Sequence, residues 1–220
     1  MPKLRLQDFE QNQKKIEDAA LRVFTRQGYH GTSVREIADE ARVSVGNLYN
    51  YYRTKEELFG RIVERYEAHI EKLREKAFRP IHRVFEPVEL QRLAHVIREI
   101  VYDNPDYWRL MYIDITEFGN RHFAGTFRSL ARNMRERLGP QLEDSTRSRS
   151  WNRGVDAALA FTAIYLQLFT YFLVEKLFGG KQHLGVSDNR AIDQLIKIAT
   201  EGLWRRGAKG KRTSARRAEK

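Results

Sequence analysis

The chain has 220 residues, no cysteine, and 40 Lys and Arg against 29 Asp and Glu, which gives a net charge of +11. The lack of cysteine excludes disulfides, thiolate metal sites and cysteine nucleophiles, and fits a cytoplasmic protein. The excess charge suggests a polyanionic partner. However, residues 205–220 carry +7 and residues 1–60 only +1, so a binding site has to be located from motifs.

Helical periodicity runs through the chain without sustained strand alternation, which predicts an all-α fold. Residues 141–150 are expected to form a polar loop or a frayed helix end, residues 181–187 a loop, and residues 207–220 a disordered basic tail. The expected helices span residues 8–27, 34–41, 45–52, 54–78, 87–102, 104–119, 120–138, 153–178 and 188–204.

Two short helices after a longer one have the layout of a helix-turn-helix. Ser33 followed by Glu36 predicts a capping box at the start of the first short helix. Ser44 can cap the second, and Val43 can fill the turn between them. Gly28 is placed as a C-cap residue behind the first helix. This layout predicts a compact unit that presents its last helix to a partner.

The outward residues of this unit favour DNA as the partner. Asn47 and Asn50 offer a donor and an acceptor, as an adenine edge in the major groove requires. Gly46 is a poor helix former, and its presence is explained if the backbone must approach a surface closely. Hydroxyls, phenols and an ammonium group can hold phosphate oxygens; the candidates are Thr32, Ser33, Tyr49, Tyr51 and Lys55.

Residues 19–24, 28–29, 32–38, 43–52 and 55–58 together resemble the signature of TetR regulators. The resemblance implies a homeodomain-like helix-turn-helix domain over 1–54 and a helical ligand-binding and dimerisation domain over 55–206. It also implies which residues contact DNA: Thr32, Ser33, Arg35, Ser44, Val45, Gly46, Asn47, Tyr49, Asn50, Tyr51 and Lys55. Tyr51 and Tyr52 replace a frequent His-Phe pair, and Tyr51 is the one favoured to face phosphate.

Each of these residues also has an interpretation without DNA. Tyr52 is expected in the core, Asn47 can be a solvated helix residue, and Arg35 can pair with nearby acids. The whole unit could be a three-helix packing element that never contacts DNA. The match of the outward positions, in addition to the core spacing, favours the DNA-binding interpretation.

The aromatic residues of the C-terminal part are consistent with an ordinary core or with an apolar ligand cavity. Because relatives of the TetR type bind inducers in this domain, we expect a pocket for a largely apolar small molecule, lined by Trp108, Met111, Tyr112, Phe127 and Tyr165. The six histidines are dispersed, so no metal is expected. No cofactor and no catalytic residues are expected either.

The segment 157–174 is very apolar, but its polar residues and flanking acids favour a buried interface helix over a membrane span. Residues 1–13 lack the apolar core of a signal peptide. Helices 153–178 and 188–204 are expected to pair with their copies across a two-fold axis. The predicted faces are Leu159, Ala163, Leu166, Thr170 and Leu173 on one helix, and Ile192, Leu195, Ile196 and Ala199 on the other.

The resemblance implies a bacterial, cytoplasmic homodimer that associates with the nucleoid when bound to double-stranded DNA. It would repress from a palindromic operator and be released by a small-molecule effector. An activator or a ligand-independent regulator is the alternative, and a helical interaction protein or an enzyme is the least favoured interpretation. The tail 207–220 could add nonspecific affinity by releasing counterions from DNA.

Overall fold

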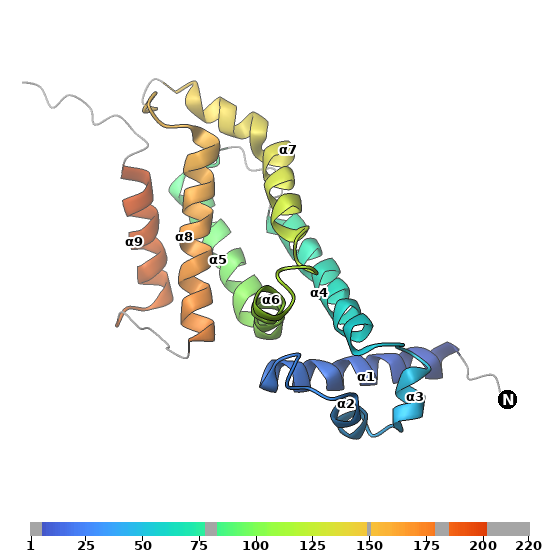
Figure 1. The fold of residues 1–220 in the computed structure, drawn as a ribbon. Coiled ribbons are helices and arrows are strands. Elements are labelled where there is room, and N and C mark those ends of the chain that lie inside the picture. The colour runs from blue at the N-terminus through green and yellow to red at the C-terminus, as the bar shows by residue number, and fades with distance from the viewer. Residues whose placement is uncertain (1–5, 78–82, 149–150, 179–184, 202–220) are drawn as a thin grey trace, which may run out of the picture.

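The computed structural model describes residues 6–77, 83–148, 151–178 and 185–201. All regular structure in these ranges is helical, as predicted (Figure 1). The helices are α1 Leu6–Gln27, α2 Val34–Ala41, α3 Val45–Tyr49, α4 Lys55–Ala77, α5 Pro87–Asp103, α6 Pro105–Glu117, α7 Thr126–Thr146, α8 Ala157–Leu177 and α9 Asp188–Glu201. The predicted tail, 207–220, lies outside the described residues.

Helices α1 to α3 form a small head at the lower end of the molecule in Figure 1. Ile16, Ala19, Val23 and Phe24 recur on one face of α1 and are fully buried, which is the periodicity of an amphipathic helix. α2 packs across this face with Ile37 and Ala38 inward. The small side chains let the helices approach closely, so a tight three-helix unit forms around few residues.

α4 connects the head to the rest of the molecule. Its first turns belong to the core of the head, because Phe59 lies 5.4 Å from Phe24 between ring centroids. The same ring lies 4.9 Å from Phe118, which follows α6. One apolar core therefore continues from the head into the C-terminal helices, across the predicted domain boundary between residues 54 and 55.

In the C-terminal part, α8 packs against α5, α7 and α9 (Figure 1). Phe161, Leu168 and Phe172 are buried on one side of α8. Among the described residues α8 is also the helix long and apolar enough to cross a membrane. Because Leu159 and Leu166 on this helix are exposed, packing within the chain accounts for only part of its apolar composition.

The predicted bounds of the helix 120–138 are wrong at both ends. α7 was expected to end before Gly139 and Pro140, but it continues through Pro140 to Thr146. Leu138 and Leu142 are both buried, so the apolar spacing continues beyond the proline, and Pro140 itself is exposed. α7 also begins later than expected, because Asn120 has a positive φ of 64°, which interrupts a helix.

Candidate functional site

The start of α2 is built as the sequence predicts. The Ser33 hydroxyl accepts a hydrogen bond from the Glu36 amide at 3.2 Å, and the Glu36 carboxylate accepts from the Ser33 amide at 2.8 Å. These bonds from Ser33, with one from Gln27, lower the pKa of Glu36. The reciprocal pairing is a complete capping box, which fixes where α2 begins relative to α1.

The same bonds limit what Thr32 and Ser33 can offer to DNA. The Thr32 side chain is buried, and its hydroxyl donates to the Gly28 carbonyl at 2.6 Å. The Ser33 hydroxyl donates to Glu36 at 2.8 Å. Since both hydroxyls already donate within the chain, the donors left at this position are the first-turn amides of α2, at Val34 and Arg35, which have no intrahelical acceptor.

α3 is a short helix whose outer side is open. Ser44 caps it by accepting from the Asn47 amide at 3.1 Å, and Leu48 anchors it in the core. Val45 is 37% exposed and Tyr49 is 49% exposed. The other predicted base-reading positions also reach the surface: Ser44, Gly46 and Asn50 are exposed and Asn47 is half-buried.

Gly46 has no structural requirement within the chain. A Cβ atom added there would meet nothing within 4 Å, and Gly46 is not among the residues with positive φ. A larger residue would therefore fit the folded chain and would favour the helix. The glycine is explained if a surface outside the chain approaches the α3 backbone, as the sequence pattern suggested.

The two tyrosines after α3 differ in burial. Tyr52 is buried, as predicted, and its hydroxyl donates to Glu17 at 2.6 Å; burial and this carboxylate raise the pKa of Tyr52. Tyr51 is half-buried against Phe9, with 4.6 Å between ring centroids. The Tyr51 hydroxyl is covered and has no hydrogen-bond partner among the described residues. In this conformation the Tyr51 hydroxyl is therefore not accessible for a phosphate contact.

Lys55 was expected to contact phosphate at the rim of the DNA-binding site, but in the structure its ammonium group makes hydrogen bonds within the chain. Nζ donates to the carbonyls of Tyr29 at 2.7 Å and Thr32 at 2.6 Å. It also lies 4.1 Å from the centroid of the Tyr29 ring. Burial lowers the pKa of Lys55 against the opposing effect of nearby carboxylates. Lys55 therefore ties the start of α4 to the α1–α2 turn and keeps one N–H for a partner.

Arg35 is exposed, and no described carboxylate lies within ion-pair distance of it. The interpretation that it pairs with nearby acids is therefore wrong for the described residues. Arg42 is a further candidate site residue that the sequence pattern did not single out. It is exposed, ends α2 in the left-handed conformation with φ 55°, and lies in the turn before α3. A basic residue where glycine is usual is the signal that could have found it.

Glu117, at the end of α6, was also missed. Its carboxylate accepts hydrogen bonds from the Tyr29 amide at 3.1 Å and the His30 amide at 2.6 Å, and it lies 2.6 Å from the His30 imidazole. Partial burial raises the pKa of Glu117, but the bonds from His30 and Tyr29 outweigh it, so the pKa is lowered. The C-terminal helices thereby hold the α1–α2 turn directly.

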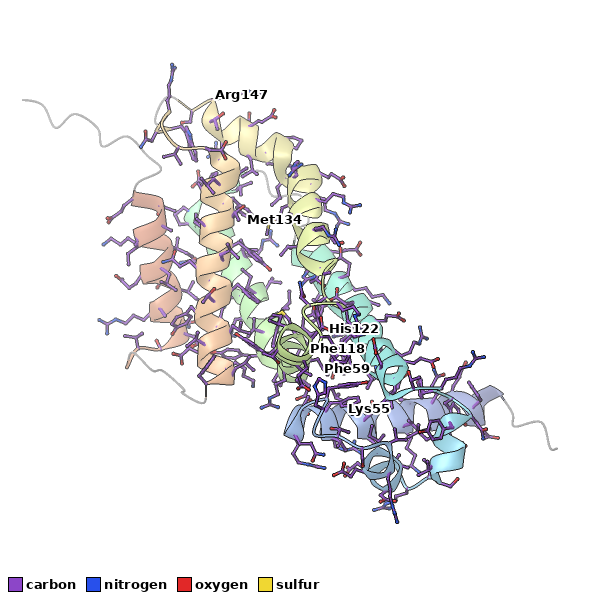
Figure 2. The ribbon with its side chains drawn as sticks, in the orientation of Figure 1. Lys55, Phe59, Phe118, His122, Met134 and Arg147 are labelled. Atoms are coloured by element: carbon purple, nitrogen blue, oxygen red, sulfur yellow. The ribbon has the colours of Figure 1, made fainter. Side chains whose placement is uncertain are left out.

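A second carboxylate of α6 organises the neighbouring connection. Asp114 is fully buried and accepts from the amides of His122 and Phe123, both at 3.0 Å. Figure 2 shows His122 and Phe118 gathered with Phe59 and Lys55, where α4 meets the head. The end of α6 therefore contacts the α1–α2 turn through Glu117, and the segment after it contacts the first turns of α4 through Phe118 and His122.

The predicted ligand-pocket residues do not line one cavity. Trp108 and Met111 are buried in the core, and the Trp108 indole donates to the Val101 carbonyl at 3.2 Å. Tyr112 is 40% exposed near the head. The side chain of Phe127 lies outside the described part of the structure. Of these five residues, Tyr165 lines a cavity of about 620 Å³ between α7 and α8.

Only some residues of the two predicted dimer faces are exposed. On α8, Leu159 is 69% and Leu166 43% exposed, but Leu173 is buried and Val174 takes its place at 42% exposure. On α9, Ile192 and Ile196 pack within the chain, whereas Ile198 is exposed.

In the described residues no group of three metal-binding side chains is found.

The geometry defines an all-helical protein with an N-terminal helix-turn-helix, and known proteins share both features. Residues 16–62 match the model of the bacterial regulatory proteins of the tetR family. The chain is 39% identical over 67 residues to the HTH-type transcriptional regulator AcrR of Shigella flexneri, covering 30% of this chain and 31% of that one. It is 32% identical over 79 residues to HbdR of Aromatoleum sp. (strain CIB), covering 34% of each.

The chain thus spans about a third of the length of these curated relatives. Solved structures match over a larger share of the chain. A TetR-like transcriptional regulator from Rhodococcus sp. RHA1 has a TM-score of 0.62 at 22% identity, over 87% of this chain and 96% of that one. The regulator KstR2 of Mycobacterium tuberculosis has 0.61 at 16% identity, over 87% and 94%. The helix-turn-helix of this chain is thus similar in sequence to those of the tetR family, and the likeness of fold extends through the C-terminal helices.

Proposed function

We propose that the protein is a sequence-specific DNA-binding regulator of transcription. The observation that carries this is the outer face of α3, where Val45, Gly46 and Tyr49 stand exposed on a helix anchored by buried Leu48. The relatives are described as HTH-type transcriptional regulators, which favours this function over an enzymatic one. In this proposal α3 enters the major groove and the start of α2 contacts the phosphate backbone.

We further propose a cytoplasmic homodimer that represses from a palindromic operator. The exposed apolar stripe of α8, which includes Leu159 and Leu166, supports pairing with a second copy, and two-fold symmetry places two α3 helices on successive major grooves. Release by an effector is proposed because Glu117 connects the end of α6 to the α1–α2 turn of the head. An effector must bind the non-DNA-binding arrangement more tightly to have this effect.

The test is selection of binding sites from random DNA, followed by affinity measurements over a range of salt concentrations. Palindromic sites with half-sites one helical turn apart are expected. Arg35→Ala should weaken binding and reduce the slope of log affinity against log salt by about 0.9 for one lost phosphate contact. Lys72→Ala is the matched control, because Lys72 is exposed on α4 away from the head. Selection that yields no preferred sequence would contradict the proposal.

A further inference from the structure

The cavity between α7 and α8 has the properties of a small-molecule site. Its volume of about 620 Å³ lies within the range of roughly 300–1,000 Å³ that such sites have. It extends along α7 from Leu130 to Thr146, about 24 Å at the rise of an α-helix. Most of its wall is apolar and includes Met134, which Figure 2 shows between the two helices, and Phe161. An elongated, mainly apolar molecule fits this shape.

Arg74 of α4 is a buried cation that does not itself line this cavity but interacts with Tyr165 of its wall. Its side chain is 7% exposed, and its Nη1 atom has no hydrogen-bond partner among the described residues. The carboxylate of Glu71 lies 3.8 Å from Nη1, beyond hydrogen-bond distance, and that side chain is 37% exposed. Arginine keeps its charge in proteins, so burying a guanidinium with an unfilled donor is costly. An anion placed there would remove this cost.

Two tyrosine hydroxyls connect Arg74 to its surroundings. Tyr107 hydrogen-bonds to Arg74 and donates to the carboxylate of Glu67 at 2.5 Å. That same oxygen of Glu67 accepts from Thr126 at 2.7 Å. Glu67 therefore already accepts from two hydroxyls, and it lies on the side of Arg74 that faces α6 and the start of α7.

Tyr165 lies on the other side and belongs to both Arg74 and the cavity. It lines the space between α7 and α8, and its hydroxyl interacts with Arg74. Burial raises the pKa of Tyr165, so the hydroxyl stays neutral and can donate. At Tyr165 the wall of the cavity thus offers a phenol that interacts with a guanidinium, and the two groups are a pair suited to a carboxylate.

We propose that this cavity binds an amphipathic carboxylate, an elongated aliphatic acid whose anionic head meets Tyr165 and Arg74 and whose tail lies along Met134 and Phe161. The proposal rests on the proposed function only in that the acid would be the effector; the site itself involves no DNA. A neutral molecule of the same shape would fill the apolar part and leave the guanidinium donor unfilled.

The experiment is calorimetric titration of the full-length protein, without DNA, with dodecanoate and with dodecan-1-ol below their aggregation limits. The carboxylate should bind about tenfold or more tightly than the alcohol, the range expected for a charge-assisted hydrogen bond. Arg74→Met should remove most of this preference, while Lys72→Ala, which removes an exposed charge from the same helix, should retain it. Thr162→Trp, which fills the cavity, should weaken both ligands.

Equal affinity for the acid and the alcohol, or a preference that survives in Arg74→Met, would overturn the proposal. If Arg74→Met does not fold by circular dichroism, the wild-type pair and Thr162→Trp decide: the preference must be present, and both ligands must be weakened. The proposed function and the proposed ligand site are contradicted by different results. Dodecanoate that binds without releasing operator DNA would contradict effector release and leave the site intact, whereas unchanged DNA binding with no dodecanoate affinity would contradict the site alone.

Discussion

A Cβ atom on Gly28 would lie 2.7 Å from Oε1 of Glu117, a distance that real Cβ contacts do not show. Gly28 also has a φ of 78°, in the region that favours glycine. The residue is therefore more than the C-cap of α1 that the sequence predicts. It leaves the space in which a carboxylate from the end of α6 reaches the amides of the α1–α2 turn.

Gly28→Ala should destabilise the protein by about 2–3 kcal/mol, since the left-handed conformation costs about 1–2 kcal/mol with a side chain and the contact with Glu117 adds to it. Urea unfolding measures the change. The double variant Gly28→Ala with Glu117→Ala should recover part of the loss, because the clashing carboxylate is gone. Additive losses in the double variant would show that the two residues act independently.

Glu117 also predicts a dependence of stability on pH. Because its folded-state pKa lies below the ordinary value of 4.5, its contribution is fully present above 4.5 and is lost as the pH falls through the folded-state pKa. Glu117→Gln should therefore lower stability at neutral pH and should lose less stability than the wild type on acidification. Unfolding free energies measured from neutral pH to below 4.5 test this. Parallel pH curves for the two proteins would contradict it.

Local patterns were sufficient to predict the parts of the head that depend on neighbouring residues. Ser33 with Glu36 predicted the start of α2, and Ser44 predicted the start of α3, because a cap bonds within its own first turn. The contacts of Lys55 and Glu117 could not be predicted in this way. Glu117 is separated from His30 by 87 residues, and no periodicity in the sequence relates two such positions.

The C-terminal errors have a similar cause. Pro140 was read as a helix end because proline lacks the amide that a helix interior uses. In the structure, burial of Leu138 and Leu142 on the same side of α7 outweighs the lost bond. Trp108 was assigned to a pocket because aromatic residues line ligand sites as well as cores. Only its satisfied indole and its burial distinguish the two, and neither is visible in the sequence.

Arg42→Gly should stabilise the fold by about 1 kcal/mol, because a residue with a side chain pays for the left-handed conformation that glycine adopts freely. Thermal or urea unfolding measures this gain. If Arg42 also contacts DNA, the variant should bind its operator more weakly and with a smaller salt dependence. Arg53→Gly, at an exposed position outside the residues with positive φ, is the control and should not gain stability.

Leu166→Arg should prevent dimer formation if α8 pairs with a second copy, because it places a charge in the centre of the exposed apolar stripe. Sedimentation measurements over a range of protein concentrations detect the change from dimer to monomer. Val88→Arg is the matched control, since Val88 is 67% exposed on α5 outside that stripe. A dimer that persists in Leu166→Arg would contradict the role of this face.

Gly46→Ala separates the requirements of folding from those of DNA binding. The added methyl group meets nothing within 4 Å, and alanine favours a helix over glycine, so the variant should be more stable by about 0.5–1 kcal/mol. If the α3 backbone approaches the floor of the major groove, the same methyl group should weaken operator binding. Stability and affinity should therefore move in opposite directions.

Gly125→Ala supplies the control for this experiment. Gly125 precedes α7 in a helical conformation, with φ −78°, and a Cβ atom there also meets nothing within 4 Å. Alanine at this position should raise stability by about 0.4–1 kcal/mol, mainly by restricting the unfolded chain, and should leave DNA binding unchanged. If Gly46→Ala binds the operator as tightly as Gly125→Ala does, the groove does not approach α3 at Gly46, and the glycine has to be explained without DNA.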